Sequence, residues 1–139
     1  MARTPDRGTS PLFAAAAIAA GLALHAPAAS AAPDGAQIFA HDCQTCHKAQ
    51  GQGVPGAFPA LAGDKLVKGD PSAVAHLLLH GKGGMPNFSA ELSDAEIAAV
   101  ITYVRGAWGN NASPVDAATV AAARSASAGP AAASVLPYH

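Results

Sequence analysis

The spacing of large apolar residues predicts one amphipathic helix in the second half of the chain. In the segment "LSDAEIAAVITYVRGAWG", such residues recur at steps of three and four, which is the period of a helix with one buried face. These residues are Ile97, Val100, Ile101, Val104 and Trp108. Ser93 and Glu96 at the start of the segment have the spacing of a capping box. We therefore predict a helix that begins after Ser93 and ends at Gly109.

Shorter helices are predicted earlier in the chain. In "DPSAVAHLLLHG", Asp70 and Pro71 have the pattern of a helix start, and Gly81 is a natural stop. A short helix that contains Ile38 and Phe39 is predicted just before the two cysteines. The segments "KAQGQGVPGAFPALAGDKLVKG" and "KGGMPNF" are interrupted by glycine and proline too often for regular structure, and we expect loops there.

Residues 110–139 form a predicted C-terminal extension. Within it, "SPVDAATVAAAR" predicts a short helix over residues 114–124, with Ser113 as its cap. From Ser125 onward the chain is rich in Ala, Ser and Pro and can bury little area, so we expect a flexible tail. The sequence has no internal repeat and no strand-like alternation. The predicted fold class is therefore all-α, with three to four short helices and glycine-rich loops.

Residues 1–32 have the pattern of a secretory signal peptide. Two arginines precede a thirteen-residue apolar run, and small residues follow it, with cleavage expected near Ala31 or Ala32. The alternative is an uncleaved membrane anchor, but a spanning helix needs roughly 20 apolar residues. We therefore expect export to a bacterial periplasm and a mature domain over residues 33–109.

Composition limits what such a domain can do by itself. The chain has 139 residues, enough for one domain, and aromatic residues make up only 5% of it. A small domain with so few large side chains usually needs a disulfide, a metal or a cofactor for stability. The net charge is -1 and no basic stripe is present, so the sequence gives no electrostatic basis for nucleic-acid binding.

The two cysteines of the chain lie in "HDCQTCHKAQGQG", and His47 directly follows the second one. A disulfide between Cys43 and Cys46 would close a very small loop and stabilise little. A zinc site would need two histidines as further ligands. A redox-active dithiol would be expected in a βαβ context, and the surroundings here are predicted to be helices and loops.

The fourth interpretation of this segment is covalent haem, because C-x-x-C-H is the attachment motif of c-type cytochromes. Residues three and four apart share one face of a helical turn. Cys43 and Cys46 can then each bond one of two neighbouring haem vinyl groups, while the His47 imidazole reaches the iron. We therefore predict one covalently bound haem c per chain, with His47 as an axial iron ligand.

The second axial ligand is predicted to be Met85. It is the one methionine after the expected cleavage site, and it lies in the glycine- and proline-containing loop "GKGGMPNF" rather than on a helix face. Two protein ligands favour electron transfer, whereas an open position allows gas binding or peroxide chemistry. The alternatives are that Met85 only fills the core, or that His76 or His80 is the ligand instead.

These features together resemble the class I cytochrome c family. The resemblance covers roughly residues 35–108, through "CQTCH", "FPALAG", "GMPNF" and "LSDAEIAAVITYV". It implies a cytochrome c fold around one haem, with the Pro59 carbonyl accepting a hydrogen bond from the axial histidine and Leu61 packing on the haem. An ordinary core role is the alternative for both residues. The resemblance also implies a helix crossing at a glycine and two aromatic residues, Gly35, Phe39 and Tyr103.

A closer resemblance is to the C-terminal haem domain of the cytochrome subunits of membrane-bound alcohol and sugar dehydrogenases. The segments "GVPGAFPALAG" and "LSDAEIAAVITYVRGAWGN" and the extension after them are similar to that domain. Those subunits carry three C-x-x-C-H motifs, whereas this chain has one. Because of this difference, we expect a free-standing version of the same haem domain rather than a permanent dehydrogenase subunit.

We expect a periplasmic electron carrier of the respiratory chain rather than an enzyme. It would pass single electrons from a donor dehydrogenase or respiratory complex to an acceptor oxidase or reductase, through brief contacts with these redox partners and peripheral association with membrane complexes. One alternative is a fixed electron-transfer subunit of a dehydrogenase or oxidase complex. The other is a haem enzyme or gas sensor with a labile sixth ligand.

Overall fold

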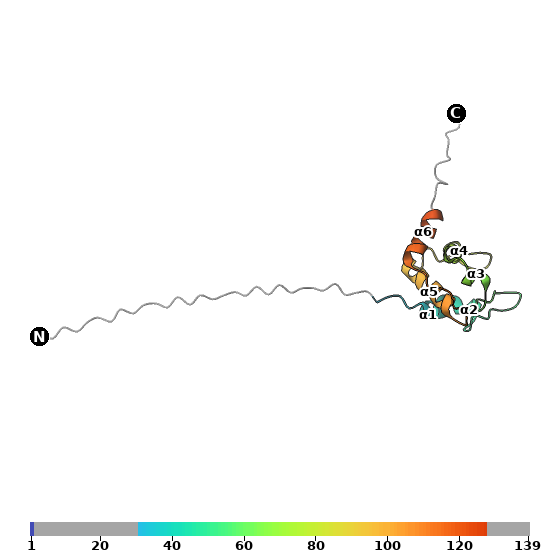
Figure 1. The fold of residues 1–139 in the computed structure, drawn as a ribbon, viewed down its shortest axis with the longest axis horizontal. Helices are drawn as coiled ribbons and strands as arrows, with labels where there is room; N and C mark the ends of the chain where they lie inside the picture. The colour runs from blue at the N-terminus through green and yellow to red at the C-terminus, as the bar shows by residue number, and fades with distance from the viewer. Residues whose placement is uncertain (2–30, 128–139) are drawn as a thin grey trace, which may run out of the picture. The chain divides into compact units, whose positions relative to one another are not determined.

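The computed structural model describes Met1 and residues 31–127 (Figure 1). In this part of the chain every regular element is a helix, and the only strand-like pairings are isolated bridges. The elements are α1 (Gly35–Ile38), the π-helix η1 (Phe39–Cys43), α2 (Gln44–His47), α3 (Lys65–Lys68), α4 (Pro71–His80), α5 (Asp94–Gly106) and α6 (Ala117–Ser127). The predicted all-α class is therefore confirmed. The predicted signal peptide falls almost entirely outside the described residues.

Helix α5 is the centre of the packing, in contact with α1, α3, α4 and α6. Its capping box is present: the Ser93 hydroxyl accepts a hydrogen bond from the Glu96 N–H at 3.3 Å, and the Glu96 carboxylate accepts one from the Ser93 N–H at 2.8 Å. The four aliphatic residues of the predicted stripe are all buried, namely Ile97, Val100, Ile101 and Val104. The helix ends at Gly106, before the predicted Gly109, because the backbone becomes extended at Ala107, with a ψ of 160°, and then turns to a φ of 50° at Trp108.

That turn lets Trp108 fold back onto the first helical segment. The Phe39 ring lies 5.5 Å from the Tyr103 ring and 5.1 Å from the Trp108 ring, measured between centroids, and Tyr103 meets Trp108 edge-on at 5.7 Å. Such tilted and edge-on pairs are favourable for aromatic rings. Beside this cluster, Gly35 lies directly against the backbone of Ala99 in α5. The expected crossing of helices at Gly35, Phe39 and Tyr103 is therefore present.

Helix α4 follows its predicted bounds, whereas α3 was not predicted. In α4 the Asp70 carboxylate accepts a hydrogen bond from the Ser72 N–H at 2.9 Å, and Gly81 ends the helix with a φ of 70°. In α3 the Asp64 carboxylate caps the helix by accepting from the Val67 N–H at 2.9 Å. A helix of four residues is too short to show a periodic pattern, which explains why the glycine-rich context suggested a loop.

The predicted helix of the C-terminal extension is present, with different ends. Helix α6 runs from Ala117 to Ser127, so it begins three residues later than predicted, and the flexible tail predicted from Ser125 was wrong for the first three of its residues. Val120 is fully buried, and α6 packs against α4 and α5. The Arg124 guanidinium also forms an ion pair with Asp94 at 2.7 Å. Packing against neighbouring helices therefore orders a segment whose composition alone would not.

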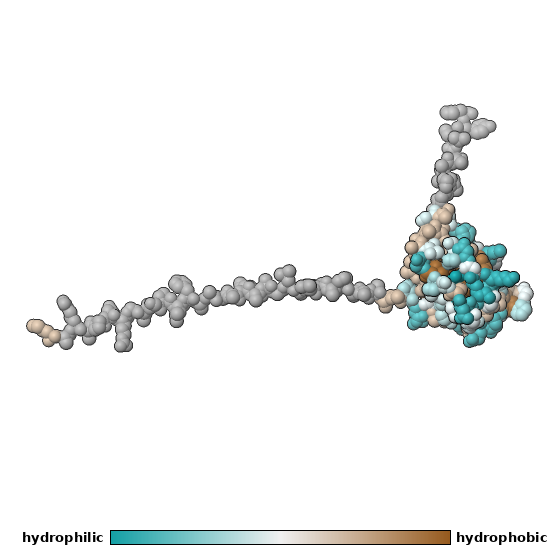
Figure 2. Space-filling model, viewed as in Figure 1, coloured by the Kyte–Doolittle hydropathy of each residue, from teal (hydrophilic) through white to brown (hydrophobic). Residues whose placement is uncertain are grey.

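The surface of the described domain is mixed in character. Figure 2 shows mainly hydrophilic and neutral residues on the face in view, with hydrophobic ones in small areas. Within residues 31–127, no helix has the length and apolar character needed to cross a membrane.

We predict that Gly35→Ala destabilises the fold. The added methyl group would overlap the Ala99 carbonyl and come within 3.0 Å of the Tyr103 Cβ, so α1 and α5 would have to separate. Overpacking of this kind typically costs about 1–3 kcal/mol in the free energy of unfolding. Denaturant titration of the holoprotein measures this cost. Gly106→Ala is the matched control, because a Cβ added at Gly106 would have no atom within 4 Å. Equal losses in both variants would contradict the close crossing.

Candidate functional site

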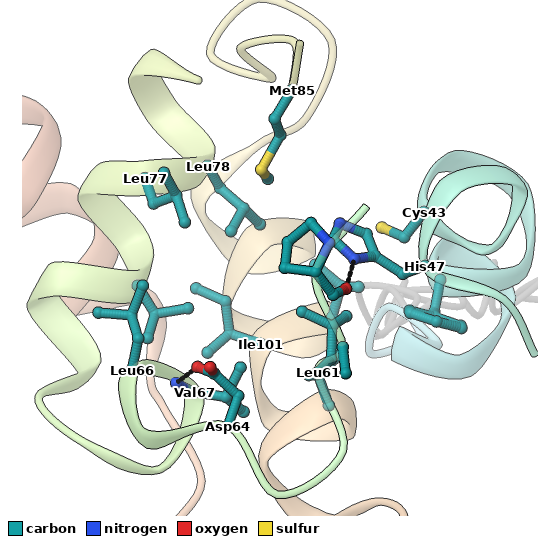
Figure 3. Close-up of a pocket in the computed structure, with 16 residues that line it drawn as sticks. Cys43, His47, Leu61, Asp64, Leu66, Val67, Leu77, Leu78, Met85 and Ile101 are labelled. Atoms are coloured by element: carbon teal, nitrogen blue, oxygen red, sulfur yellow. Dashed lines mark hydrogen bonds between the residues drawn. The ribbon is translucent and has the colours of Figure 1, made fainter. Parts of the chain in front are cut away.

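A mostly apolar cavity lies between the segment η1–α2 and the helices α3, α4 and α5 (Figure 3). It encloses about 780 Å³ of empty space, part of it open to solvent. Its apolar lining includes Leu61, Val67, Leu77, Leu78, Val100 and Ile101. Three residues with chemically reactive side chains, Cys43, His47 and Met85, line the same cavity. An adjoining hollow of about 760 Å³ shares these three residues and adds Cys46.

The two cysteines are unpaired thiols at the edge of this space, and both are partly buried. Burial, with smaller contributions from Asp42 and Cys46, raises the pKa of the Cys43 thiol to about 12. A redox-active dithiol requires a lowered pKa and a ready thiolate, which is the opposite condition. Among residues 31–127, no group of three or more His, Cys, Asp or Glu side chains could hold a metal ion. The dithiol and zinc interpretations therefore gain no support from the described residues.

His47 ends helix α2 and is 9% exposed. Its Nδ1 lies 2.9 Å from the carbonyl oxygen of Pro59. A carbonyl can only accept a hydrogen bond, so the proton must be on Nδ1, and Nε2 of the neutral ring then carries a lone pair. The structure thus contains the hydrogen bond that the family resemblance implies, and it presents one imidazole nitrogen as a donor for a metal.

The loop after His47 is shaped to bring the Pro59 carbonyl to the imidazole. The Gly53 N–H donates to the His47 carbonyl at 2.9 Å. Gly53 has a φ of 63°, and a Cβ at this position would lie 2.6 Å from both the carbon and the oxygen of the Pro59 carbonyl. Only glycine combines this backbone conformation with so close an approach. Gly53 is therefore part of the site.

Met85 reaches the cavity from a tight turn after α4. The Lys82 N–H donates to the Met85 carbonyl at 3.2 Å, and the Met85 N–H donates to the Lys82 carbonyl at 3.0 Å. Gly81, with a φ of 70°, lies directly against the Met85 carbonyl and starts this turn. In Figure 3 the Met85 side chain points from its loop into the cavity. His47 and Met85 come from different segments and line both hollows.

The remaining candidate residues divide into two groups. Pro59 and Leu61 line the cavity, as the resemblance implies. His76 and His80 are exposed and line neither hollow, so the structure does not place them as alternatives to Met85. Two thiols, an imidazole with a lone pair on Nε2 and a thioether thus surround one apolar space. This donor set fits a haem that is attached to Cys43 and Cys46.

Two buried polar residues, Asn110 and Arg105, support the site and were not among the predicted site residues. The Asn110 side chain accepts from the Gly63 N–H at 2.7 Å and donates to the Leu61 and Val104 carbonyls at 3.1 and 2.8 Å. It therefore fastens the loop after Pro59 to the end of α5. No sequence pattern indicated Asn110, because this residue lies after the predicted end of the helix.

Arg105 is the second of these residues and is only 4% exposed. Its guanidinium donates to the carbonyls of Val67, Gly69 and Ser113 at 2.7, 2.9 and 2.7 Å. It thereby connects the end of α3, which lines the cavity, to α5 and to the extension. Arg105 stands four residues after Ile101, so its place on the buried helix face could have been found from the sequence.

We predict that Asn110→Ala lowers the free energy of unfolding by about 2 kcal/mol, because it removes a buried side chain that forms three hydrogen bonds, with the Gly63 N–H and with the Leu61 and Val104 carbonyls. Chemical denaturation of the holoprotein is the measurement. Asn87→Ala is the control: Asn87 is exposed and accepts only one hydrogen bond, from the Ser89 hydroxyl at 3.2 Å. Its expected change is within about 0.5 kcal/mol. A similarly small change for Asn110→Ala would contradict the fastening role.

Comparison with known proteins gives the family of this chain. The family described as "Cytochrome C oxidase, cbb3-type, subunit III" matches residues 30–104. The cytochrome c subunit of a quinone-dependent alcohol dehydrogenase from Gluconobacter oxydans is 38% identical over 90 residues, which are 56% of this chain and 19% of that subunit. This chain thus spans about a fifth of the subunit's length.

Smaller relatives match over more of their length. Cytochrome c-552 of Thermus thermophilus is 42% identical over 97 residues, which cover 59% of this chain and 65% of that protein. Cytochrome c6 of a Picosynechococcus species is 37% identical over 93 residues, which cover 60% of this chain and 79% of that protein. A crystal structure of cytochrome c6 from the diatom Phaeodactylum tricornutum is 32% identical, covers 64% of this chain and 93% of its own, and has a TM-score of 0.42. The chain therefore belongs to the cytochrome c oxidase, cbb3-type, subunit III family, and it is a mono-haem class I cytochrome c domain with covalently bound haem c.

Proposed function

We propose that this protein is a periplasmic single-electron carrier in which His47 and Met85 are the axial ligands of the haem iron. One observation carries the proposal. The His47 ring, with Nδ1 occupied by Pro59, and the Met85 side chain line the same apolar cavity as Cys43. Two protein ligands leave no open position for a substrate, which favours electron transfer over catalysis at the iron.

When bound, the haem supplies one iron that exchanges a single electron. Cys43 and Cys46 would hold the haem by thioether bonds, which would fix its position relative to the His47 ring. The Pro59 carbonyl fixes the tautomer and the orientation of the His47 ring. The apolar walls around Leu78 and Ile101 keep water away from the iron, and a thioether ligand raises the reduction potential compared with a second histidine.

The N-terminal segment supports the proposed location, and the relatives support the proposed partners. We propose that residues 1–32 are an export signal, that residues 33–109 are the haem domain and that residues 110–139 extend it. The relatives include a cytochrome c subunit of a quinone-dependent alcohol dehydrogenase and the subunit CcoP of a cbb3-type cytochrome c oxidase. These names support a carrier that accepts electrons from a dehydrogenase and delivers them to a terminal oxidase or reductase.

A fixed subunit of such a complex is the second candidate, and the similarity to two subunits of complexes favours it. In that role the extension over residues 110–139 is the candidate docking element. In the structure, however, Val120 and Ala123 of α6 are buried within the domain itself. Purification of the native protein separates the two candidates, because a fixed subunit would stay with a larger partner through several columns.

We predict a methionine-to-iron charge-transfer band in the visible spectrum of the ferric protein and no reaction of the ferrous protein with carbon monoxide. Met85→Ala should abolish the band and allow carbon monoxide to bind, because it removes the sixth ligand. Leu66→Ala is the matched control: this half-exposed residue lines the same cavity but has no donor atom. A wild-type protein with a high-spin ferric spectrum and ready carbon monoxide binding would refute the carrier proposal and favour a gas sensor or enzyme.

We also predict that Gly53→Ala raises the midpoint potential. The new methyl group would displace the Pro59 carbonyl, weaken its bond to His47 Nδ1 and make Nε2 a weaker donor to the ferric iron. The expected rise is smaller than the ~59 mV that corresponds to a tenfold change in a one-electron equilibrium. Gly56→Ala is the control, because Gly56 also has a positive φ, 76°, but no atom lies near its Cβ position. The measurement is a redox titration of both variants and of the wild type. Equal midpoint potentials for Gly53→Ala and Gly56→Ala would show that the Pro59 contact does not tune the iron.

A further inference from the structure

The outer face of α4 carries two histidines that the haem site does not use. His76 and His80 are four residues apart and therefore lie on one face of the helix. Both side chains are exposed, and their rings are stacked, with centroids 4.0 Å apart and an angle of 23° between the ring planes. The cavity is lined by other residues of the same helix, Leu77 and Leu78.

The hydrogen bonding of this pair leaves nitrogen donors available. Nδ1 of His80 lies 2.8 Å from the His76 carbonyl oxygen, which can only accept, so this nitrogen carries the proton. Nε2 of the neutral His80 ring therefore holds a lone pair. The His76 ring is open to water, so its Nε2 can take the same state without losing a buried contact.

We propose that His76 and His80 form a bidentate site for a divalent transition-metal ion, and that Cu²⁺ binds there more tightly than Zn²⁺. A metal–imidazole bond is about 2.0–2.1 Å long, so one ion can join two nitrogen atoms at most about 4 Å apart. The ring centroids are 4.0 Å apart, and both rings are exposed, so rotation of the side chains can turn one nitrogen of each ring toward a common ion. Neutral imidazoles suit copper and zinc, and copper precedes zinc in the general order of affinities. Water completes the coordination.

The proposed site is separate from the haem iron but lies on an element that supports it. His80 is the last residue of α4, and Gly81 starts the turn that ends at Met85. An ion held by His76 and His80 would join two successive turns at the C-terminal end of α4. Binding to the folded form alone would stabilise this end of the helix. The proposal requires that neither His76 nor His80 binds the haem iron, and both residues lie outside the lining of the two hollows.

Titration of the ferric holoprotein with Cu²⁺ tests this proposal. Calorimetry gives the affinity, and electron paramagnetic resonance counts the nitrogen ligands of the copper. We expect one equivalent of Cu²⁺ with two imidazole nitrogens, and a dissociation constant at least tenfold larger in His76→Ala and in His80→Ala. Alanine has the highest helix propensity, so both variants should keep the helix, and an unchanged haem spectrum verifies the fold.

His41→Ala is the matched control, because His41 is also exposed but pairs with Asp42 at 2.6 Å, away from α4. Copper binding should be unchanged in this variant. If the double variant of His76 and His80 binds copper as tightly as the wild type, the proposal is overturned. It is also overturned if only one of the two single variants weakens binding, because the ion would then be held by one histidine rather than by a chelating pair.

Discussion

The hydrogen bond between His47 Nδ1 and the Pro59 carbonyl is the interaction on which the site depends. It places the proton on Nδ1, so Nε2 is the imidazole nitrogen whose lone pair can bind an iron atom. Much of the surrounding backbone holds this bond in place. Gly53 allows the Pro59 carbonyl to approach, and Asn110 fastens the loop that follows, through Leu61 and Gly63. A bond between residues twelve positions apart is thus supported by a side chain that lies after the C-terminal end of α5.

The helical frame brings these loop segments together by two close contacts. Gly35 lets α1 lie directly on the backbone of α5, and Phe39 then meets Tyr103 and Trp108. The Trp108 ring also lies directly against Gly51, whose carbonyl accepts hydrogen bonds from the Leu61 and Ala62 N–H groups at 2.7 and 3.0 Å. The aromatic cluster therefore connects the helix crossing to the loop that carries Pro59.

Helix α4 and the C-terminal extension have different structural roles. One face of α4 lines the apolar cavity with Leu77 and Leu78, and the other carries the stacked pair His76 and His80. In the segment that follows the Met85 loop, the Ser89 and Leu92 carbonyls accept hydrogen bonds from Arg124 of α6 at 2.7 and 3.2 Å. Arg124 also forms an ion pair with Asp94. The extension thus fastens the connection between the Met85 loop and α5. These bonds, together with the burial of Val120, explain why a segment with little apolar area forms the helix Ala117–Ser127.

The sequence by itself determined the features that depend on neighbouring residues. The capping box of α5, the start and stop of α4 and the C-x-x-C-H motif all act within four residues, so their patterns could be read directly. Only the tertiary structure decided the turn at Trp108, the helix α3, the extent of α6 and the roles of Arg105 and Asn110. The bonds of Arg105 to Val67 and of Asn110 to Leu61 span 38 and 49 residues. No local pattern encodes such contacts, because they form only after the helices have packed and brought distant carbonyls within reach.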